Sequence, residues 1–191
     1  MPLHPQAKAF LKAQESLDAP DITTNLVEYR AMSHLDDDLA GPLTLGVRIE
    51  HRYLTSPTAD LPVNLYIPKG NGPFNGLVYF HGGGWVAYDI NRYSPQLSAI
   101  AESTNSVVIA VNYQKAPEHK FPIPFDDCYS ALEWTFANSA ELLIDSKKIG
   151  IGGDSAGGNL ASGVAIKARD QGKFDVAYQL LIYPANSPSY V

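Results

Sequence analysis

The chain has 191 residues, of which 45% are hydrophobic and 18% are charged, which is enough for one globular domain with a sizeable core. Its formal net charge of −6 and its isoelectric point of about 5.2 argue against a nucleic-acid ligand or an anionic membrane surface, because both attract basic patches. No run approaches the roughly 18 apolar residues of a membrane span, so the sequence predicts no transmembrane helix.

The first 40 residues have the periodicity of two helices. Apolar side chains recur at helical spacing over residues 5–18 and again over residues 22–40. Asn25 and Glu28 are spaced as a capping box, the reciprocal hydrogen-bond pattern at the start of a helix. Gly41 and the proline after it then interrupt the pattern.

The period of the apolar residues changes after that interruption. Residues 47–54 and 61–67 alternate between apolar and polar side chains, which predicts an antiparallel margin of a sheet with one wet face. From residue 76 onward, continuously apolar strands alternate with helices. We expect strands at 76–80, 106–113, 148–153 and 177–183 and helices at 91–104, 124–140 and 155–171. This order predicts parallel βαβ units, and hence an α/β fold with helices on both faces of a mostly parallel sheet.

One expected strand turns directly into a helix at Gly153-Asp154-Ser155-Ala156-Gly157, which fits the pattern G-x-S-x-G. In this context the serine lies on a sharp, strained turn with its hydroxyl exposed, and it is a candidate nucleophile. We expect glycine on both sides because side chains there would collide with the neighbouring strand and helix. The N–H of Ala156 opens the helix, where the helix dipole favours negative charge.

A second glycine-rich stretch, HGGGW, follows an expected strand and comprises His81, Gly82, Gly83, Gly84 and Trp85. Consecutive glycines let the backbone approach a substrate closely and present N–H groups. After the third strand of an α/β-hydrolase, such a loop supplies the other half of the oxyanion hole. One such donor contributes roughly 3–4 kcal/mol to transition-state stabilisation. The two motifs in this order are more specific than either motif alone.

Glycine-rich strand-to-helix turns also bind dinucleotides, but the spacing here does not fit that site. Counted from Gly150 and Gly152, the position of the third Rossmann glycine holds Ser155. The acidic residue needed about 20 residues later is misplaced, because Asp175 precedes the next strand. No P-loop lysine follows. A purely structural glycine turn stays open as an alternative, although it does not account for the HGGG loop upstream.

Four stretches resemble the hormone-sensitive-lipase family of α/β-hydrolase esterases: HGGGW (81–85), APEHKFP (116–122), GGDSAGGN (152–159) and LLIYP (180–184). The resemblance runs over most of the chain. It implies an α/β-hydrolase fold, incomplete at the C-terminus, with about six of the expected eight strands. It also implies a helical cap region at residues 1–40, followed at 41–191 by the N-terminal part of the catalytic domain.

By that resemblance Ser155 is the nucleophile, and the N–H groups of Gly83, Gly84 and Ala156 form the oxyanion hole. The supporting residues are then His81, Gly82, Gly153, Asp154 and Gly157. The resemblance further implies hydrolysis of small-molecule carboxylic esters without a metal or an organic cofactor. No nucleic-acid partner and no membrane span are expected.

Two positions depart from the family pattern. Where the family often has Tyr-Arg-Leu, this chain has Tyr113, Gln114 and Lys115, which removes a positive charge near the framework of the site. Where the family favours glycine, this chain has Tyr88, which we expect to narrow the entrance of the pocket.

The triad of an α/β-hydrolase continues from the serine to an acid and then to a histidine, but no histidine follows Ser155 in this sequence. Asp170 and Asp175 lie around the end of the helix that follows the serine, so we expect neither to be catalytic. The histidines of the chain are His4, His34, His51, His81 and His119. Only His81 is local, and we expect its side chain to point away from the serine.

The family carries its acid and histidine after two further strands, which would follow residues 177–183. Those residues have the pattern of an interior strand, and an unpaired apolar edge promotes association. We therefore expect a truncated or divided chain that associates through 177–183 or with a separate C-terminal polypeptide.

Three functional hypotheses follow. The first is a carboxylic ester hydrolase that acts through an acyl-enzyme on Ser155. The second is a catalytically dead ligand-binding protein on the same scaffold, similar to the gibberellin receptors of plants. The third is a folding fragment without function. The absence of a signal-peptide pattern and the single Cys128, expected to be a buried inert thiol, predict a cytoplasmic location.

Overall fold

The computed structural model describes residues 2–14, 20–21, 24–32 and 40–187. The chain divides into two compact units, an N-terminal unit of residues 1–35 and a main unit of residues 36–191. The two units are described separately.

The N-terminal unit contains two helices, α1 (Pro5–Gln14) and α2 (Leu26–Met32). The backbone N–H of Glu28 donates to Oδ1 of Asn25 at 3.3 Å, and the Asn25 side-chain amide donates to the Glu28 carboxylate. One half of the expected capping box is therefore present, whereas the Asn25 N–H donates to the Asp21 carbonyl at 2.8 Å and the Glu28 carboxylate accepts from the Asn25 side chain instead. The α2 helix begins at Leu26, after the non-helical residues 24 and 25, and the predicted helical residues 15–18, 22–23 and 33–39 lie outside the described residues.

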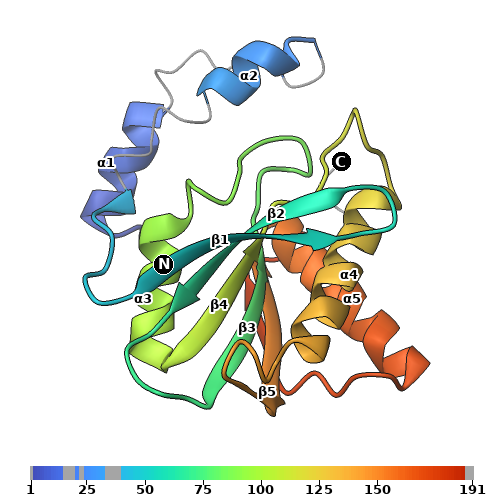
Figure 1. The fold of residues 1–191 in the computed structure, drawn as a ribbon. Helices are drawn as coiled ribbons and strands as arrows, with labels where there is room; N and C mark the ends of the chain where they lie inside the picture. Colours follow the sequence, from blue (N-terminus) through green and yellow to red (C-terminus); the bar gives the residue numbers. More distant parts are fainter. Residues whose placement is uncertain (1, 15–19, 22–23, 33–39, 188–191) are drawn as a thin grey trace. The chain divides into compact units, whose positions relative to one another are not determined.

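The main unit is built on a six-stranded sheet in the order β1-β2-β4-β3-β5-β6 (Figure 1). Its strands are β1 (Arg48–Thr55), β2 (Asp60–Ile67), β3 (Phe74–Phe80), β4 (Ser106–Val111), β5 (Ile144–Asp154) and β6 (Gln179–Ile182). The β2 strand is antiparallel to both β1 and β4, whereas β4, β3, β5 and β6 run parallel. The predicted antiparallel margin and parallel centre are confirmed, but the expected wet face is absent from β2, whose last five residues are all buried because Leu65 and Tyr66 pack into opposite cores.

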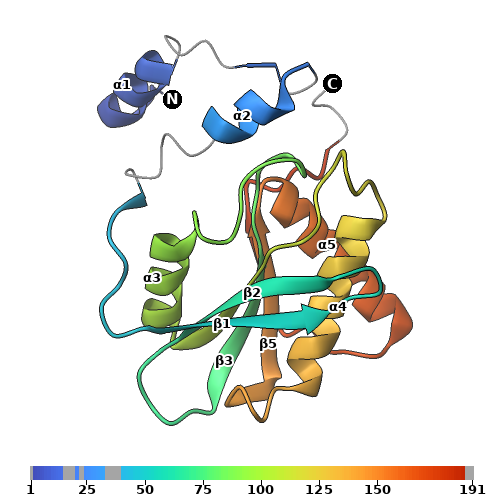
Figure 2. The ribbon, with the colours of Figure 1, turned by 45° about the horizontal axis from the view of Figure 1, so that its top comes forward.

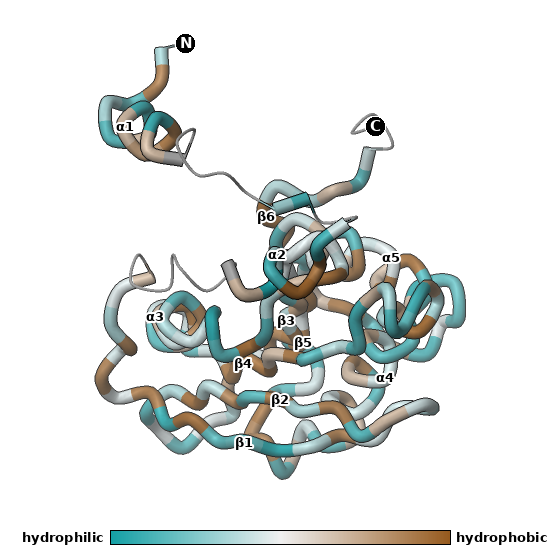
Figure 3. The backbone as a smooth tube through the Cα atoms, turned by 90° about the horizontal axis from the view of Figure 1, so that it is seen from above, coloured by the Kyte–Doolittle hydropathy of each residue, from teal (hydrophilic) through white to brown (hydrophobic). Residues whose placement is uncertain are grey.

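Helices cover both faces of this sheet, as Figures 1 and 2 show. The α3 helix (Ser94–Thr104) packs on one face, and α4 (Ile123–Ala137) and α5 (Ala156–Gln171) pack on the other. Seen from above, α3 lies on one side of the central strands and α4 and α5 on the other (Figure 3). The main unit is therefore a three-layer α/β structure with two apolar cores.

The central strand β4 shows why both faces must be covered. Its side chains alternate between the two cores: Val107, Ile109 and Val111 face α4 and α5, whereas Val108 and Ala110 face α3. All five are buried. Burial of a valine or isoleucine side chain contributes about 1.5–3 kcal/mol to the free energy of folding. A strand that is apolar on both faces gains this contribution in full only where helices cover both faces of the sheet.

The bounds of the predicted elements of the main unit differ from the structure by up to four residues, the largest difference being the start of β5 at Ile144 instead of residue 148. Two further differences concern α3 and β6. The helix expected from residue 91 begins at Ser94, with Pro95 in its first turn, because the three preceding residues form a turn. The strand expected at 177–183 is the four-residue β6, whose Leu181 is 37% exposed. On its far edge β6 pairs with no other strand in the part of the chain that the structure describes.

None of the described helices is long and apolar enough to cross a membrane.

Candidate active site

Ser155 lies between the last residue of β5 and the first residue of α5. Its φ of 50° and ψ of −117° form a strained combination for a residue that carries a side chain. Hydrogen bonds hold the backbone there: the Ser155 N–H donates to the Ile182 carbonyl at 3.0 Å, and the Ala185 N–H donates to the Ser155 carbonyl at 3.0 Å. The turn is thus fixed by the last residue of β6 and by the segment that follows this strand.

The glycines on both sides of the serine allow this turn to contact the neighbouring strand. A Cβ at Gly153 would lie 2.5 Å from the carbonyl oxygen of Phe80, the last residue of β3. A Cβ at Gly157 would lie 2.0 Å from that oxygen and 2.6 Å from the carbonyl oxygen of His81. Real Cβ atoms do not approach backbone atoms so closely, so only glycine fits at either position.

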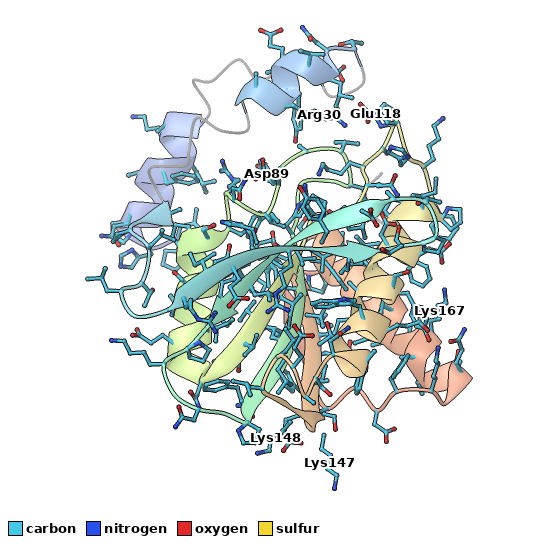
Figure 4. All side chains as sticks on the ribbon, in the orientation of Figure 1. Arg30, Asp89, Glu118, Lys147, Lys148 and Lys167 are labelled. Carbon is cyan, nitrogen blue, oxygen red and sulfur yellow. The ribbon has the colours of Figure 1, made fainter. Side chains whose placement is uncertain are left out.

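The glycine loop, defined here as residues 81–85, leaves the same edge of the sheet as the serine turn. Phe80 is paired in register with Gly153, so the loop and the turn start side by side at the carboxyl ends of adjacent parallel strands. Figure 4 helps to locate this edge: Asp89 lies near it, whereas Lys147 lies at the opposite edge, where β5 begins. The structure thus brings together the two motifs that sequence reasoning paired.

The loop presents N–H groups that are available to a ligand. Gly83 and Gly84 have φ values of 107° and 59°, in the region that favours glycine. Val86 donates to the Gly83 carbonyl at 3.1 Å, which closes the turn. Among the described residues, no acceptor pairs with the N–H of Gly83 or Gly84. The N–H of Ala156 is the first of α5 and has no acceptor within its helix.

Asp154 connects the serine turn to the glycine loop. Its buried carboxylate accepts hydrogen bonds from the Gly82 N–H at 3.0 Å and the Tyr79 hydroxyl at 2.9 Å, both at Oδ1, and from the Tyr93 hydroxyl at 3.0 Å at Oδ2. Burial, and then the charge of Asp154, raises the pKa of both phenols above its usual value. Sequence reasoning selected Asp154 but missed both tyrosines, which lie 75 and 61 residues before it.

His81 is buried beneath the loop. Its ring stacks on Tyr113 with 4.4 Å between ring centroids, and Nδ1 lies 2.6 Å from the Gly82 carbonyl oxygen. Nε2 is buried without a hydrogen-bond partner among the described residues. Burial, reinforced by the charge of Lys115, lowers the pKa of His81 to about 3. A ring that stays neutral and is turned into the core is poorly suited to take the proton of Ser155.

The other candidates for a base or an acid lie elsewhere. Among the described histidines, His51 is in β1 and pairs with Asn64 at 2.6 Å, and none hydrogen-bonds to Ser155; His34 lies outside the described residues. Asp170 is near the far end of α5, roughly 20 Å from the serine at about 1.5 Å of rise per residue. Exposed Asp175 lies beyond that end.

The two positions that depart from the family pattern, Gln114 and Tyr88, both make defined contacts. The side-chain amide of Gln114 lies 3.3 and 3.2 Å from the two carboxylate oxygens of buried Asp127, and the Gln114 N–H donates to it at 2.9 Å. A neutral amide therefore accompanies this buried carboxylate. Tyr88 has a φ of 67°, the left-handed conformation that favours glycine. Its ring packs against Gly83, and the Arg92 guanidinium lies 4.5 Å above it.

A pocket of about 670 Å³ lies beside the loop and α5. Apolar side chains dominate its lining, among them Trp85 from the glycine loop, Phe125 from α4 and Ile166 from α5. Asn159, whose N–H donates to the Ser155 carbonyl at 3.1 Å, also lines it. An apolar cavity therefore begins one helical turn from the serine.

The family model described as alpha/beta hydrolase fold matches residues 77–190 of this chain. The chain belongs to the α/β-hydrolase family. The matched residues begin within β3 and include the glycine loop, the serine turn and the parallel strands β4, β5 and β6.

Named relatives point to the same branch of this family. Carboxylesterase NlhH of Mycobacterium tuberculosis is 40% identical over 142 residues, which cover 72% of this chain and 44% of the relative. An arylesterase of Saccharolobus solfataricus is 32% identical over 193 residues, which cover 96% of this chain and 60% of the relative. The resemblance to hormone-sensitive-lipase-like esterases is thereby confirmed.

A solved structure agrees with these relatives. The hyperthermophilic esterase of the archaeon Pyrobaculum calidifontis superimposes with a TM-score of 0.85 at 34% identity, over 97% of this chain and 60% of the esterase. The chain thus spans 44% to 60% of the length of these three relatives.

We predict that Gly157→Ala destabilises the protein by about 1–3 kcal/mol, the usual cost of overpacking, because the new methyl group collides with the end of β3. Gly163→Ala in the same helix is the matched control, since its Cβ meets only the ring of Phe125, at 3.0 Å. Urea unfolding of the two variants measures the difference. An unfolding free energy for Gly157→Ala equal to that of Gly163→Ala would contradict the close contact.

We predict a pH-dependent loss of stability that involves His81. The folded pKa of about 3 lies below the unfolded value of about 6.5, so the unfolded chain binds the extra proton between these pH values. The contribution of His81 to the free energy of unfolding is therefore fully present above about pH 6.5. It decreases as the pH drops towards 3, by up to about 1.4 kcal/mol per pH unit. Urea unfolding at several pH values should give a shallower slope for His81→Gln. Parallel slopes for the two proteins would refute the prediction.

Proposed function

We propose that the protein hydrolyses carboxylic esters through an acyl-enzyme on Ser155. The observation that carries this proposal is the contact between the serine turn and the glycine loop at one edge of the sheet, with N–H groups unpaired on both sides. Such an arrangement offers a nucleophile and oxyanion donors to the same carbonyl group.

The proposed reaction follows from the roles of these groups. The Ser155 hydroxyl oxygen attacks the acyl carbon, and the N–H groups of Gly83, Gly84 and Ala156 donate to the oxygen that becomes negatively charged. The tetrahedral intermediate collapses with loss of the alcohol, and water then releases the acid from the acyl-enzyme. The chemistry needs a base to accept the serine proton and return it to the alcohol, but it needs no metal or organic cofactor.

We assign the base to a histidine that follows Ser155 in the whole protein, because no described histidine hydrogen-bonds to Ser155 and His81, which begins the glycine loop, is buried and neutral. This assignment concerns the whole protein, of which the chain represents 44% to 60% in the three relatives compared. The family pattern, in which the acid and the histidine follow the nucleophile, supports it.

We propose small esters with an apolar group as substrates. The pocket beside Trp85 and α5 has an apolar lining and a volume of about 670 Å³, within the range of small-molecule sites. The relatives named carboxylesterase and arylesterase agree with this substrate class.

The cytoplasmic location stays a prediction that rests in part on the single Cys128. This residue is buried, and burial raises the pKa of its thiol well above the usual value.

The second candidate function is a ligand-binding protein on the same scaffold. The lack of a base near Ser155 among the described residues favours it, since a binding protein needs none. A ligand that raises the midpoint of thermal unfolding without being hydrolysed would identify this function.

The role of residues 1–40 as a cap over the site also stays a proposal. The two helices of the N-terminal unit carry exposed apolar side chains, including Phe10, Leu11 and Val27. An amphipathic helix needs an apolar surface to cover, and the pocket offers one.

We predict that the full-length gene product hydrolyses p-nitrophenyl esters and that Ser155→Ala abolishes this activity. The 191-residue chain alone should be essentially inactive, because loss of the triad histidine lowers turnover by about a million-fold in a serine protease. The measurement is the release of p-nitrophenolate by both proteins, each with its Ser155→Ala variant. Ordinary turnover by the 191-residue chain, lost in Ser155→Ala, would show that a base exists among these residues, with His81 the first to test.

We predict that removal of residues 1–40 from the active full-length protein changes the acyl-chain preference more than the stability. The reason is that a cap shapes the mouth of the pocket but not the two cores of the main unit. The measurement is kcat/KM for esters from acetate to decanoate, with the thermal midpoint as the control. An unchanged chain-length profile would count against the cap.

A further inference from the structure

The hydroxyl group of Tyr93 occupies a bridging position between the two halves of the site. It accepts a hydrogen bond from the Gly82 N–H at 3.1 Å and donates one to Asp154 Oδ2 at 3.0 Å. The same Gly82 N–H also donates to Asp154 Oδ1 at 3.0 Å. These three hydrogen bonds form a closed ring of Gly82, Tyr93 and Asp154. Gly82 belongs to the glycine loop, Tyr93 precedes α3, and Asp154 ends β5 just before Ser155.

We infer that Tyr93 is a positioning residue that holds the glycine loop against the serine turn through Asp154. This inference rests on the proposed function, because the positions it holds are those of the oxyanion donors. Gly82 immediately precedes Gly83, and Asp154 immediately precedes Ser155. The ring thus fixes the spacing between donors and nucleophile.

Within the described part of the chain, few hydrogen bonds tie the loop to other elements of the fold. Its glycines carry no side chains that could pack, and two further bonds reach beyond the loop and its next two residues: the Tyr113 hydroxyl donates to the His81 carbonyl at 2.8 Å, and the Ala116 N–H donates to the Trp85 carbonyl at 2.9 Å. The other bonds on the central glycines are local, from His81 Nδ1 to the Gly82 carbonyl and from the N–H groups of residues 86 and 87 to the Gly83 carbonyl. Because a displacement of about 1 Å at a catalytic group can cost about a hundredfold in rate, such a loop depends on its anchors.

Close packing holds the members of the hydrogen-bonded ring, Gly82, Tyr93 and Asp154, in their positions. A Cβ at Gly82 would lie 2.4 Å from Asp154 Oδ2, so the loop backbone lies directly on the carboxylate. The ring of Tyr93 lies among other aromatic rings, with centroids 6.1 Å from Tyr79, 5.9 Å from His81 and 6.4 Å from Tyr88. Burial and the Asp154 charge raise the pKa of Tyr93, so its hydroxyl stays a donor throughout the neutral range.

The structure provides two matched controls for Tyr93. The Tyr79 hydroxyl donates to the same carboxylate at 2.9 Å but has no bond to the loop. The Tyr178 hydroxyl donates to the Gly76 carbonyl at 2.7 Å, near the start of β3 and therefore at the opposite edge of the sheet. All three can be changed to phenylalanine, which removes one hydroxyl group each time.

The first experiment measures hydrogen exchange of the backbone amides of residues 81–88 in the 191-residue chain, which needs no catalysis. Tyr93→Phe should accelerate this exchange about fivefold or more, the factor expected for loss of a typical hydrogen bond. Tyr79→Phe should have a smaller effect, and Tyr178→Phe should leave the exchange of these residues unchanged. Exchange in Tyr93→Phe equal to that in Tyr178→Phe would overturn the inference.

The second experiment measures ester hydrolysis by the full-length protein. Tyr93→Phe should lower kcat roughly tenfold to a hundredfold with little change in KM, because the donors act on the transition state. Tyr178→Phe should retain the wild-type kcat even where its thermal midpoint falls equally. A loss confined to stability, or an equal loss of kcat in both variants, would show that Tyr93 is only a structural residue.

The two experiments also separate this inference from the proposed function. If no ester is hydrolysed, the proposed function fails, whereas the exchange experiment still decides whether Tyr93 holds the loop. If Tyr93→Phe does not fold, Asp154→Asn serves instead, since its side chain has one acceptor oxygen in place of two and cannot accept from both the Tyr93 hydroxyl and the Gly82 N–H, so the hydrogen-bonded ring opens in either orientation. The same accelerated exchange is then expected, and unchanged exchange in a folded Asp154→Asn would overturn the inference.

Discussion

The arrangement of the candidate site depends on one contact in which no side chain takes part. The first turn of α5 lies directly on the carbonyl oxygen of Phe80, and a Cβ at Gly157 would come within 2.0 Å of that oxygen. The register of β3 and β5, which pairs Phe80 with Gly153, sets this contact. Sheet pairing therefore determines how the serine turn and the glycine loop meet, and Gly153, Gly157 and Gly82 are the glycines that this contact requires.

The carboxylate of Asp154 lies in the interior at this contact, and hydrogen-bond donors around it stabilise it. Asp154 is 5% exposed, and a buried carboxylate without partners would cost several kcal/mol. It accepts three hydrogen bonds, one of them from the glycine loop. Asp127, fully buried in α4, holds the backbone of Gln114 after β4 in a similar way. Buried carboxylates thus tie the segments after two adjacent strands to the framework, so each loop is held by electrostatics as well as by packing.

Much of this site could be predicted from the sequence because its motifs are local. The pattern around Ser155 and the HGGG loop each depend on residues close together in the chain, and parallel strands bring their carboxyl ends to one edge. The role of Tyr93 could not be predicted, because the carboxylate it meets lies 61 residues away and tyrosine follows no local rule. The bounds of β6 were also predicted too widely, since an apolar run does not show how many of its residues find a partner strand.

Backbone strain is concentrated at the same edge of the sheet. Four of the six described non-glycine residues with positive φ lie at this edge. Trp85 is in the glycine loop and Tyr88 follows it, while Ser155 forms the serine turn and Tyr183 follows β6. Each such residue costs on the order of 1–3 kcal/mol and persists only where its surroundings hold it. The strands β3, β5 and β6 provide that support, because their hydrogen-bonded pairing anchors the glycine loop, the serine turn and the segment that begins at Tyr183. Positive φ values at the serine turn and in the glycine loop thus coincide with the hydrogen bonds and close contacts that hold both segments, and such preorganisation is what stabilisation of an oxyanion requires under the proposed function.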